Sequence, residues 1–545
     1  MAVFIGGAWP YANGSLHLGH LAALLPGDII ARYYRLKGED VLYVSGSDCN
    51  GTPISIRAKQ ENKSVKEIAD LYHEEFQECF HSLGFTYDHY TRTDSTYHHQ
   101  VVRATFLELL KNDWLYKRIV KQAFCISCDQ FLPDRFVVGV CPNCESNCRG
   151  DQCENCSTIL DPIDLKERSC KFCQEEPIFK ETEHFYLALS KIQTQLEIYI
   201  HQNKNFWRGN AIQMTNRYLT EGLLDRAVTR DIEVGVTVPV EGYENKKVYV
   251  WIDAVSGYLS AAQEWAQINK REWHPFWQEN TVSYYIHGKD NIPFHTIIWP
   301  SILLGSGILS LPKHIISSEY LTIEKKKLST SGNWAIWIKD LLSRYNPDTI
   351  RYFLTINGPE KRDADFSWRE FIYRHNGELL GSLGNLVQRT IKFYQKEFGP
   401  IFELTNINQN IKEKIERIFD ESGAMLERGD CKKSLDSIFE FVRWGNKYFD
   451  EQKPWAVLKE NREEAREVLH DCLYVIINLG VLLQPFLPFT TEKIVKGLSL
   501  EQLELFWQPV ETPVQLKITL NEPLFKRIDI EQIDKEREKL GNTTY

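Results

Sequence analysis

The sequence predicts an α/β fold in which a doubly wound parallel sheet is split by a cysteine-rich insertion and followed by an all-helical domain. Three observations predict it. Short apolar runs alternate with helix-length amphipathic segments up to about Asp365. Nine of the thirteen cysteines fall between Cys125 and Cys173. From about Phe366 the apolar residues follow helical spacing, with almost no strand signal.

Length and composition limit the class of protein. A chain of 545 residues is too long for one core and indicates about three domains, and 25% charged residues is ordinary for a globular protein. The longest apolar run, Tyr474 to Leu483, is too short to cross a bilayer, and the N-terminus does not resemble a signal peptide, so we expect a cytoplasmic protein that contacts no membrane. The net charge of −10 argues against nucleic-acid binding through bulk charge, but not through local basic patches.

The first element is a short buried strand, which the apolar stretch from Val3 to Ala8 predicts. Asn13, Gly14 and Ser15 are expected to supply a turn and a helix N-cap. An amphipathic run from Leu16 to Leu36 then predicts the first helix.

Two histidines stand at the start of this helix. His17 and His20 share one face, where free backbone N–H groups and the helix dipole favour an anion, and Gly19 would let a nucleotide approach the backbone. Imidazole N–H groups could therefore hold triphosphate oxygens. Taken alone, the pair could equally be satisfied within a helix cap.

The alternation of strands and helices continues along the chain. Because ligands lie at the carboxyl ends of such strands, we expect the site there. The further strands are predicted at Val41–Ser45, Val248–Trp251, Val282–Ile286 and His314–Ile316, with helices up to Leu83 and from Ser95 to Lys111. In the helical domain, one apolar stripe is formed by Leu379, Leu383, Leu386 and Val387, and others continue through Asp450 and from Glu463 to Gln484.

Eight of the clustered cysteines form four C-x-x-C pairs, which are Cys125/Cys128, Cys141/Cys144, Cys153/Cys156 and Cys170/Cys173. Each pair is a turn-sized unit of the kind that gives two thiolates to tetrahedral zinc. Disulfides are the alternative, but a cytoplasmic chain disfavours them. The spacing does not fix which pairs share an ion, and Cys148 is left over. A metal in such full sites would be structural, because the insertion is too short to build its own core.

The box His17-Leu18-Gly19-His20 and the later box Lys327-Leu328-Ser329-Thr330-Ser331 resemble the two signatures of class I aminoacyl-tRNA synthetases. From about Val3 to Phe489 the chain is similar to the methionyl-tRNA synthetase family. The resemblance implies five segments: the first half of a Rossmann-type catalytic domain (1–116), a connective insertion with zinc knuckles (117–186), the second half of the catalytic domain (187–320), a loop and stem-contact region (321–365), and a helical anticodon-binding domain with a C-terminal tail (366–545).

The resemblance also implies the reaction. The enzyme would attach L-methionine to tRNA(Met) through a methionyl-adenylate, using ATP with Mg²⁺ and releasing AMP and pyrophosphate. It implies two structural Zn²⁺ ions in a nested arrangement, one on Cys141, Cys144, Cys153 and Cys156 and the other on Cys125, Cys128, Cys170 and Cys173. The chain carries no added oligonucleotide-binding module before Tyr545, so we expect a monomer.

The family's functional residues fall on matching positions here. The resemblance implies the following roles: catalysis by His17, His20, Lys327 and Arg230; methionine binding by Trp9, Tyr11, Asp48, Trp251, Tyr258 and His295; ATP binding by His17, Gly19, His20, Gly288, Asp290, Lys327, Ser329 and Thr330; and anticodon binding by Asn385, Arg389 and Trp455. Without the resemblance, Asp48 could be the N-cap of the next helix, and Trp455 could be a packing residue.

Four positions depart from the family's usual pattern. Trp9 stands where leucine is usual, Val255 where proline is frequent, and Asn50 where histidine commonly precedes the glycine. Thr330 replaces the second lysine of the loop, so Lys325 or Lys326 is expected to compensate, although the lysine run could simply be a solvated face.

Three other interpretations compete with this one. Other class I synthetases carry a larger editing insertion or, for cysteine, an open zinc site, and neither is visible in the sequence. A small nucleotidyltransferase without tRNA would lack the helical domain. A non-catalytic tRNA- or zinc-knuckle-binding descendant would be expected to have lost His17, His20 or Asp48, and all three are present.

Overall fold

The computed structural model describes residues 1–150, 153, 155–156, 160–279, 281–308, 310–330, 332–511 and 515–541. Its central sheet is parallel throughout, in the order β14-β13-β1-β2-β3. The strands are β1 (Ala2–Gly7), β2 (Asp40–Ser47), β3 (His89–Arg92), β13 (Val282–Gly288) and β14 (His314–Ser318). The strand order reverses at β1, so the crevice for a ligand is expected at the carboxyl ends of β1, β2 and β13.

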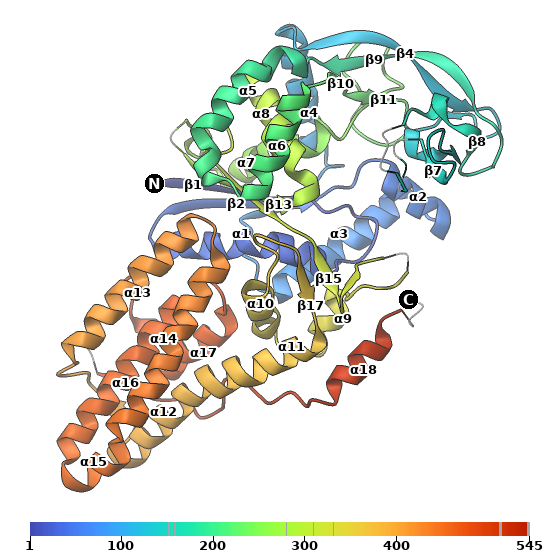
Figure 1. Cartoon of the computed structure of the whole chain (residues 1–545). Coiled ribbons are helices and arrows are strands. Elements are labelled where there is room, and N and C mark those ends of the chain that lie inside the picture. Colours follow the sequence, from blue (N-terminus) through green and yellow to red (C-terminus); the bar gives the residue numbers. More distant parts are fainter. Residues whose placement is uncertain are drawn as a thin grey trace.

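Helices cover both faces of this sheet, as a doubly wound fold requires (Figure 1). Alternate residues of β1 serve the two cores, since Val3 and Ile5 pack with α1 and Phe4 packs with α7 and α8. On one side lie α1 (Leu18–Leu36) and α3 (Val65–Ser82). On the other lie α4 (Thr96–Lys111), α5 (Leu189–Asn203), α6 (Gly209–Glu221), α7 (Asp253–Asn269) and α8 (Trp299–Gly305).

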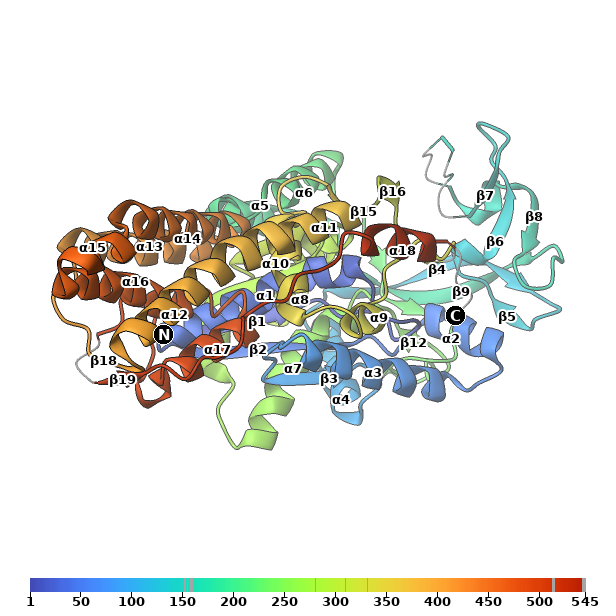
Figure 2. The same ribbon diagram turned by 90° about the horizontal axis from the view of Figure 1, so that it is seen from below.

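The insertion is an antiparallel unit built on two long strands, at the opposite end of the molecule from the helical bundle (Figure 2). The larger sheet, in the order β10-β9-β4-β5, comprises β4 (Leu115–Cys125), β5 (Gln130–Phe131), β9 (Ile178–Leu187) and β10 (Arg226–Ala227). The smaller sheet, in the order β7-β6-β8, comprises β6 (Val137–Val140), β7 (Asn147–Arg149) and β8 (Lys166–Cys170). The core of the smaller sheet is small and includes Cys125, Cys141, Cys153 and Cys170.

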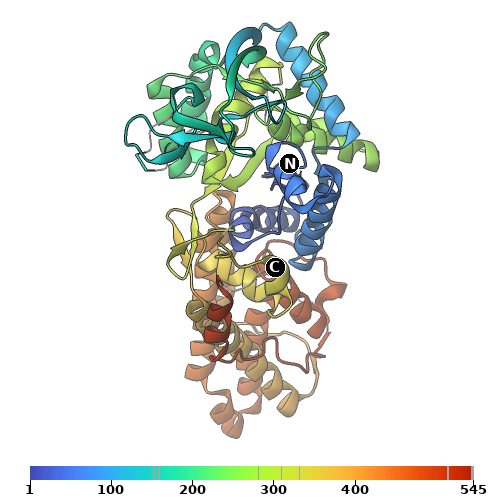
Figure 3. The ribbon, with the colours of Figure 1, turned by 90° about the vertical axis from the view of Figure 1, so that its right-hand side faces the viewer.

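The second half of the chain leads from a small three-stranded sheet into the helical bundle, which extends away from the half that holds the central sheet (Figure 3). The connecting elements are β15 (Leu321–Ile323), β16 (Lys326–Lys327), β17 (Ala364–Phe366), α9 (Ile338–Leu342) and α10 (Pro347–Ile356). The helices of the bundle are α11 (Trp368–Arg374), a π-helical stretch (His375–Gly384), α12 (Asn385–Phe398), α13 (Gln409–Glu427), α14 (Cys431–Gln452), α15 (Pro454–Glu460), α16 (Arg462–Leu482) and α17 (Pro488–Gly497). The bundle also includes a short antiparallel pair, β18 (Ile401–Phe402) and β19 (Leu516–Lys517), and the helix α18 (Gln532–Lys539). None of the described helices is both long and apolar enough to span a bilayer.

A buried ion pair joins the connecting helix α10 to the first helix of the sheet. Arg351 on α10 lies 2.7 Å from Asp28 on α1, and neither side chain is exposed to solvent. Arg351 also donates to the carbonyls of Leu83, Pro485 and Phe486, which belong to both halves. The pair therefore fixes how the bundle sits against the sheet.

Three expectations about elements need correction. The first helix is capped by His17, not by Asn13, Gly14 or Ser15, and begins at Leu18. The strand expected over Val248–Trp251 is only β12 (Lys247–Val248), which pairs outside the central sheet with β11 (Thr229–Arg230). The fifth strand of the sheet, β3, was not predicted, because its four residues carry no apolar run.

Candidate active site and cysteine clusters

The two histidines of the first box lie directly on each other. The rings of His17 and His20 stack with centroids 3.7 Å apart, and the backbone N–H of His17 donates to Nδ1 of His20 (3.3 Å). Burial lowers the pKa of His17 to about 4 and that of His20 well below its usual value. Both rings are therefore neutral, and the proton of His20 is placed on Nε2.

The fold brings the segment after the second box onto the first. Leu18 N–H donates to the Ile336 carbonyl (3.0 Å) and Ile338 N–H donates to the Leu16 carbonyl (2.9 Å), on either side of a bridge between His17 and Trp337. Two boxes about three hundred residues apart thus form one structure.

Gly19 has a local packing role beside the one expected. A Cβ at this position would lie 3.1 Å from the His17 ring and 3.5 Å from the Leu328 side chain. The missing side chain makes room for the histidine and for the loop, in addition to any approach by a nucleotide.

The loop itself is open to solvent. Lys327 and Thr330 are exposed, and Ser329 pairs its backbone with Trp334. The ammonium of Lys326 lies 4.2 Å from the centre of the Trp334 ring. Ser331 lies outside the described residues. Lys327 lies at the start of this loop, and none of its described contacts joins it to the histidines.

Asp48 directly follows β2 and is 3% exposed. Its backbone pairs with the segment after β1, because Asp48 N–H donates to the Pro10 carbonyl and Ala12 N–H donates to the Asp48 carbonyl, both at 2.8 Å. Burial, followed by the charge of Asp253, raises the pKa of its carboxyl to about 8. The N-cap of helix α2 (Thr52–Glu61) is Gly51, so Asp48 is not a capping residue.

Tyr258 on α7 and His295 in the π-helical stretch Phe294–Ile298 form a buried pair. The Tyr258 hydroxyl lies 2.7 Å from Nε2 of His295, whose Nδ1 donates to the Asn291 carbonyl (2.8 Å). With its proton on Nδ1, His295 accepts the tyrosine hydrogen on Nε2. Burial lowers the pKa of His295 to about 4, so the ring is neutral. A neutral polar pair in an apolar surrounding suits an uncharged group.

Aromatic residues surround this region. The Trp9 ring fills a slot between two glycines, since a Cβ on Gly46 would lie 2.2 Å from it and one on Gly257 would lie 2.6 Å from it. Trp251 stacks on Phe294 at 5.0 Å. Tyr11, which is 38% exposed, follows Trp9 at the rim.

Three further residues were predicted to contact ATP, and the structure places them as follows. The Arg230 guanidinium lies 4.2 Å from the centre of the Tyr249 ring and donates to the Thr229 carbonyl (2.9 Å). Asp290 accepts a hydrogen bond from the Tyr320 hydroxyl, and a Cβ on Gly288 would meet nothing. Among the described contacts none joins Arg230 to His17, His20 or Asp48.

The eight paired cysteines gather in two groups of four, one formed by Cys125, Cys128, Cys170 and Cys173 and the other by Cys141, Cys144, Cys153 and Cys156. The predicted nested grouping is confirmed. Sulfur atoms from different pairs lie 3.3 to 3.9 Å apart. Four thiolates about 2.3 Å from one zinc ion would be about 3.8 Å apart, so the groups fit a tetrahedral ion.

The candidate anticodon residues meet at the far end of the bundle. Asn385 donates to Oδ1 of Asn446 (3.2 Å), and Arg389 pairs with Asp450 (2.7 Å). The ring of Phe449 lies 4.3 Å from the Arg389 guanidinium and 5.9 Å from the ring of Trp455, which is 46% exposed. The three candidates thus surround one end of α14.

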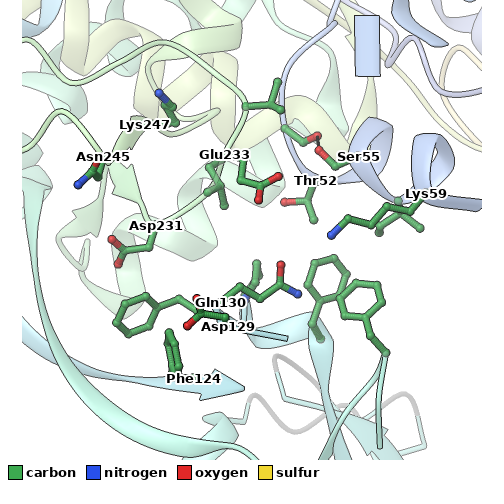
Figure 4. A pocket seen from close by; sticks show the side chains of 18 of the residues that line it. Thr52, Ser55, Lys59, Phe124, Asp129, Gln130, Asp231, Glu233, Asn245 and Lys247 are labelled. Atoms are coloured by element: carbon green, nitrogen blue, oxygen red, sulfur yellow. Dashed lines mark hydrogen bonds between the residues drawn. The ribbon is translucent and has the colours of Figure 1, made fainter. Parts of the chain in front are cut away.

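A cavity of about 470 Å³ lies beside the Asp48 loop, between α2, the insertion and the β11–β12 segment. Figure 4 shows Thr52, Gln130 and Glu233 facing one another across it, with Lys59 at one side. Its aromatic wall includes Phe124, Phe131, Phe136 and Phe172. Sequence reasoning missed this cavity, because its lining comes from five separate segments that only the fold brings together.

Comparison with known proteins places the whole chain. A family model described as "tRNA synthetases class I (M)" matches residues 3–391, and one described as "Anticodon binding domain of methionyl tRNA ligase" matches residues 402–544. Curated methionine–tRNA ligases of Bacillus mycoides and Bacillus cereus are each 57% identical over 542 residues, which is 99% of this chain and of theirs. A solved Mycobacterium tuberculosis methionyl-tRNA synthetase bound by methionyl-adenylate has the same fold, with a TM-score of 0.81 at 21% identity over 96% of this chain and 100% of that one.

These matches cover the sheet, the insertion and the bundle. None of the three competing interpretations explains a match that extends over all three parts. The cysteine and larger-insertion synthetases, the small nucleotidyltransferases and the non-catalytic descendants are set aside. The chain belongs to the methionine–tRNA ligases, which are class I aminoacyl-tRNA synthetases.

Proposed function

We propose that the crevice at the carboxyl ends of β1, β2 and β13 carries out the ligase reaction of this family in two steps. L-methionine first reacts with ATP to give methionyl-adenylate and pyrophosphate, and the methionyl group then passes to the ribose at the 3′ end of tRNA(Met), releasing AMP. One observation carries the assignment to this crevice: the box that holds His17 and His20 and the segment after the second box are hydrogen-bonded to each other.

Asp48 is proposed to bind the α-ammonium group of methionine. Its burial supports this role, because a buried carboxylate gains most from a cation that enters beside it. Tyr258 and His295 are proposed to meet the thioether, which carries no charge and accepts hydrogen bonds only weakly. Trp9, Tyr11 and Trp251 would complete the wall of the pocket.

The phosphates of ATP are proposed to lie against the start of α1. Nε2–H of His20, the free N–H groups of this helix end and the Lys327 ammonium would stabilise the charge that grows as the methionine carboxylate attacks the α-phosphorus. Gly19, Ser329 and Thr330 belong to the same surface, Arg230 is proposed to reach the reacting phosphate, and Gly288 and Asp290 are proposed to line the nucleoside. Mg²⁺ bound to ATP supplies charge neutralisation. Among the described residues, the clusters that could hold an ion are the two cysteine groups, which fits arrival of Mg²⁺ with the nucleotide.

Two surfaces are proposed to meet tRNA. Trp455 would stack an anticodon base, while Asn385 and Arg389 would bind base edges, because unpaired bases are recognised in this way. The cavity beside the Asp48 loop would receive the unpaired 3′ end, since its wall is aromatic and Gly51 and Thr52 line it a few residues after Asp48.

Both cysteine groups are proposed to hold structural Zn²⁺. The backbone N–H groups of Ser146 and Glu175 lower the pKa of Cys144 and Cys173, whereas the pKa values of Cys125, Cys128 and Cys153 are raised. The support for zinc is therefore the spacing of the sulfur atoms, and a bound ion would supply the charge that keeps all eight as thiolates. The ions would hold the small core of the insertion together and take no part in the reaction. The enzyme is further proposed to be a cytoplasmic monomer, with the five segments expected above.

The test is amino-acid-dependent exchange of labelled pyrophosphate into ATP, with Mg²⁺, across all twenty amino acids. Exchange with methionine alone is expected. Exchange with another amino acid would overturn the pocket assignment, and no exchange in folded, zinc-replete protein would overturn the activation chemistry.

A further inference from the structure

Behind Asp48 lies a second buried carboxylate whose role the reaction above does not use. Asp253, at the start of α7, is 3% exposed. Asn50 bridges the two acids, because its backbone N–H donates to Oδ1 of Asp48 and its side-chain amide donates to Oδ2 of Asp253, both at 3.1 Å. Two carboxylates this close cannot both remain ionised without compensation.

The compensation comes from His98 on α4, which is completely buried. Its Nε2 lies 2.9 Å from Oδ1 of Asp253, and its Nδ1 lies 2.8 Å from the Ser260 hydroxyl. We assign that hydroxyl as the donor to the Gly257 carbonyl (3.1 Å), so that its oxygen accepts from Nδ1–H of His98.

It follows that His98 and Asp253 share an additional proton. With Nδ1 protonated, a contact of 2.9 Å between Nε2 and a carboxylate oxygen needs a second hydrogen between them. Whether that hydrogen is written on nitrogen or on oxygen, the pair has no net charge. With the charge of Asp253 compensated by His98, Asp48 is the carboxylate of the two that can ionise. Burial, the larger cause, still raises its pKa to about 8, and a cation that enters beside it would lower that pKa.

The hydrogen bonds around Asp48 leave one of its carboxylate oxygens available for a ligand. Its Oδ1 accepts hydrogen bonds from the Asn50 N–H and from the Thr93 hydroxyl, both at 3.1 Å, and in the described part of the chain Oδ2 remains for a ligand. The other titratable groups facing this cluster are Asp94, His99 and Glu264. Glu264 is held by His89 and Thr91.

We propose that His98 is a positioning residue which, by keeping a proton in its pair with Asp253, leaves Asp48 as the carboxylate that receives the α-ammonium group of methionine. This inference rests on the proposed function of Asp48. It also explains the unusual Asn50, since its amide can donate to both the Thr93 carbonyl and Asp253 without adding another titrating group.

The test is the pH dependence of kcat/KM for methionine in pyrophosphate exchange, from pH 6 to pH 9. In His98→Gln the charge of Asp253 is no longer compensated, so Asp48 holds its proton more tightly and the acid limb of the profile moves up by about one pH unit. KM should rise about tenfold near pH 7 and return toward the wild-type value near pH 9. Removing the charge in His98→Gln/Asp253→Asn should move the acid limb back.

Ser260→Ala gives a second variant that keeps the histidine. It removes the acceptor of Nδ1–H, so the additional proton is no longer held and the acid limb should again move up. Ser256→Ala is the matched control, because the Ser256 hydroxyl is buried on the same helix and, among the described residues, its hydrogen-bond partner is the Ile252 carbonyl alone. Its profile should match the wild type.

Two results would overturn the proposal. One is a rise in KM that is equal at every pH in His98→Gln, which is the pattern of a merely structural role. The other is a double variant no closer to wild type than the single one. Asp48→Asn distinguishes failure of the proposed function of Asp48 from failure of the role of His98. An unchanged KM for methionine in Asp48→Asn would overturn the function of Asp48 itself. A large rise in KM in Asp48→Asn, together with an unchanged pH profile in His98→Gln, would overturn the role of His98 alone.

Discussion

The imidazole of His17 lies on the imidazole of His20, with centroids 3.7 Å apart and planes inclined by 14°. Because Nδ1 of His20 accepts from the His17 backbone, its Nε2 is the donor, and the stack holds that donor in one direction. A donor fixed before the substrate arrives costs no reorganisation during the reaction.

His20→Ala should therefore slow adenylate formation. Loss of one fixed donor to a developing phosphate charge costs about 10²- to 10³-fold in rate. Single-turnover formation of methionyl-adenylate measures this step directly. His201→Ala, which changes an exposed histidine on α5, is the control and should leave the rate unchanged. An unaltered rate in His20→Ala would remove His20 from the phosphate site.

The free energy of unfolding should decrease as the pH is lowered, because several histidines are buried in the neutral state. Burial lowers the pKa of His295 to about 4, whereas the same group titrates near 6.5 in the unfolded chain. Since the unfolded chain binds the proton more tightly, the contribution of His295 is complete above about pH 6.5 and is lost as pH falls toward 4. It amounts to at most about 3 kcal/mol.

Urea unfolding at pH 7 and pH 4.5 measures this dependence. His295→Gln removes the titrating group and should reduce the loss between the two pH values. An equal loss in the variant and the wild type would mean that other groups carry the pH dependence.

The central sheet could be predicted from sequence wherever a strand is apolar on both faces, as in Val282–Ile286. It could not be predicted for His89–Arg92, whose residues pair with β2 but are mostly half-exposed. The nested grouping of the cysteines followed from the family resemblance and not from the spacing, which allows other pairings.

The residues of the candidate site also differ in how far the sequence alone predicts them. His17 and Asp48 stand in motifs that sequence can reveal, but His98 stands 155 residues before its partner Asp253 in an ordinary helix. Only the packing of α4 on α7 brings the two side chains together. Residues that act through another residue leave no local pattern in the sequence.

Tyr258→Phe should weaken methionine binding and lower the free energy of unfolding. The change removes one hydroxyl and leaves Nε2 of His295 without its hydrogen-bond donor, which costs about 1–3 kcal/mol in a buried site. KM for methionine should rise about tenfold or more, with a smaller change in kcat. Tyr285→Phe is the control, because the Tyr285 hydroxyl bonds to the Trp299 indole instead. Equal effects of both variants would contradict a special role for the Tyr258–His295 pair.

Removal of zinc should unfold the insertion first. Metal analysis of the purified protein should find two zinc ions per chain, and Cys128→Ser should lose one of them, since its thiolate belongs to a single group of four. The melting temperature should fall with it, because metal binding is part of the folding free energy of such a small core. Cys148→Ser should keep both ions. Fewer than two ions in the wild type would contradict the two-site arrangement.

Trp455→Ala should separate the two halves of the reaction. The side chain is 46% exposed at the end of the bundle, far along the chain from the catalytic sheet, so its loss should leave pyrophosphate exchange within about twofold of wild type. Charging of tRNA(Met) should fall by about tenfold or more, since stacking of one unpaired base contributes about 1–3 kcal/mol. Tyr373→Ala, which removes another exposed aromatic ring from α11, is the control and should change neither activity. Equal loss of exchange and charging in Trp455→Ala would mean that the residue supports the fold, and the anticodon surface would then have to be sought elsewhere on the bundle.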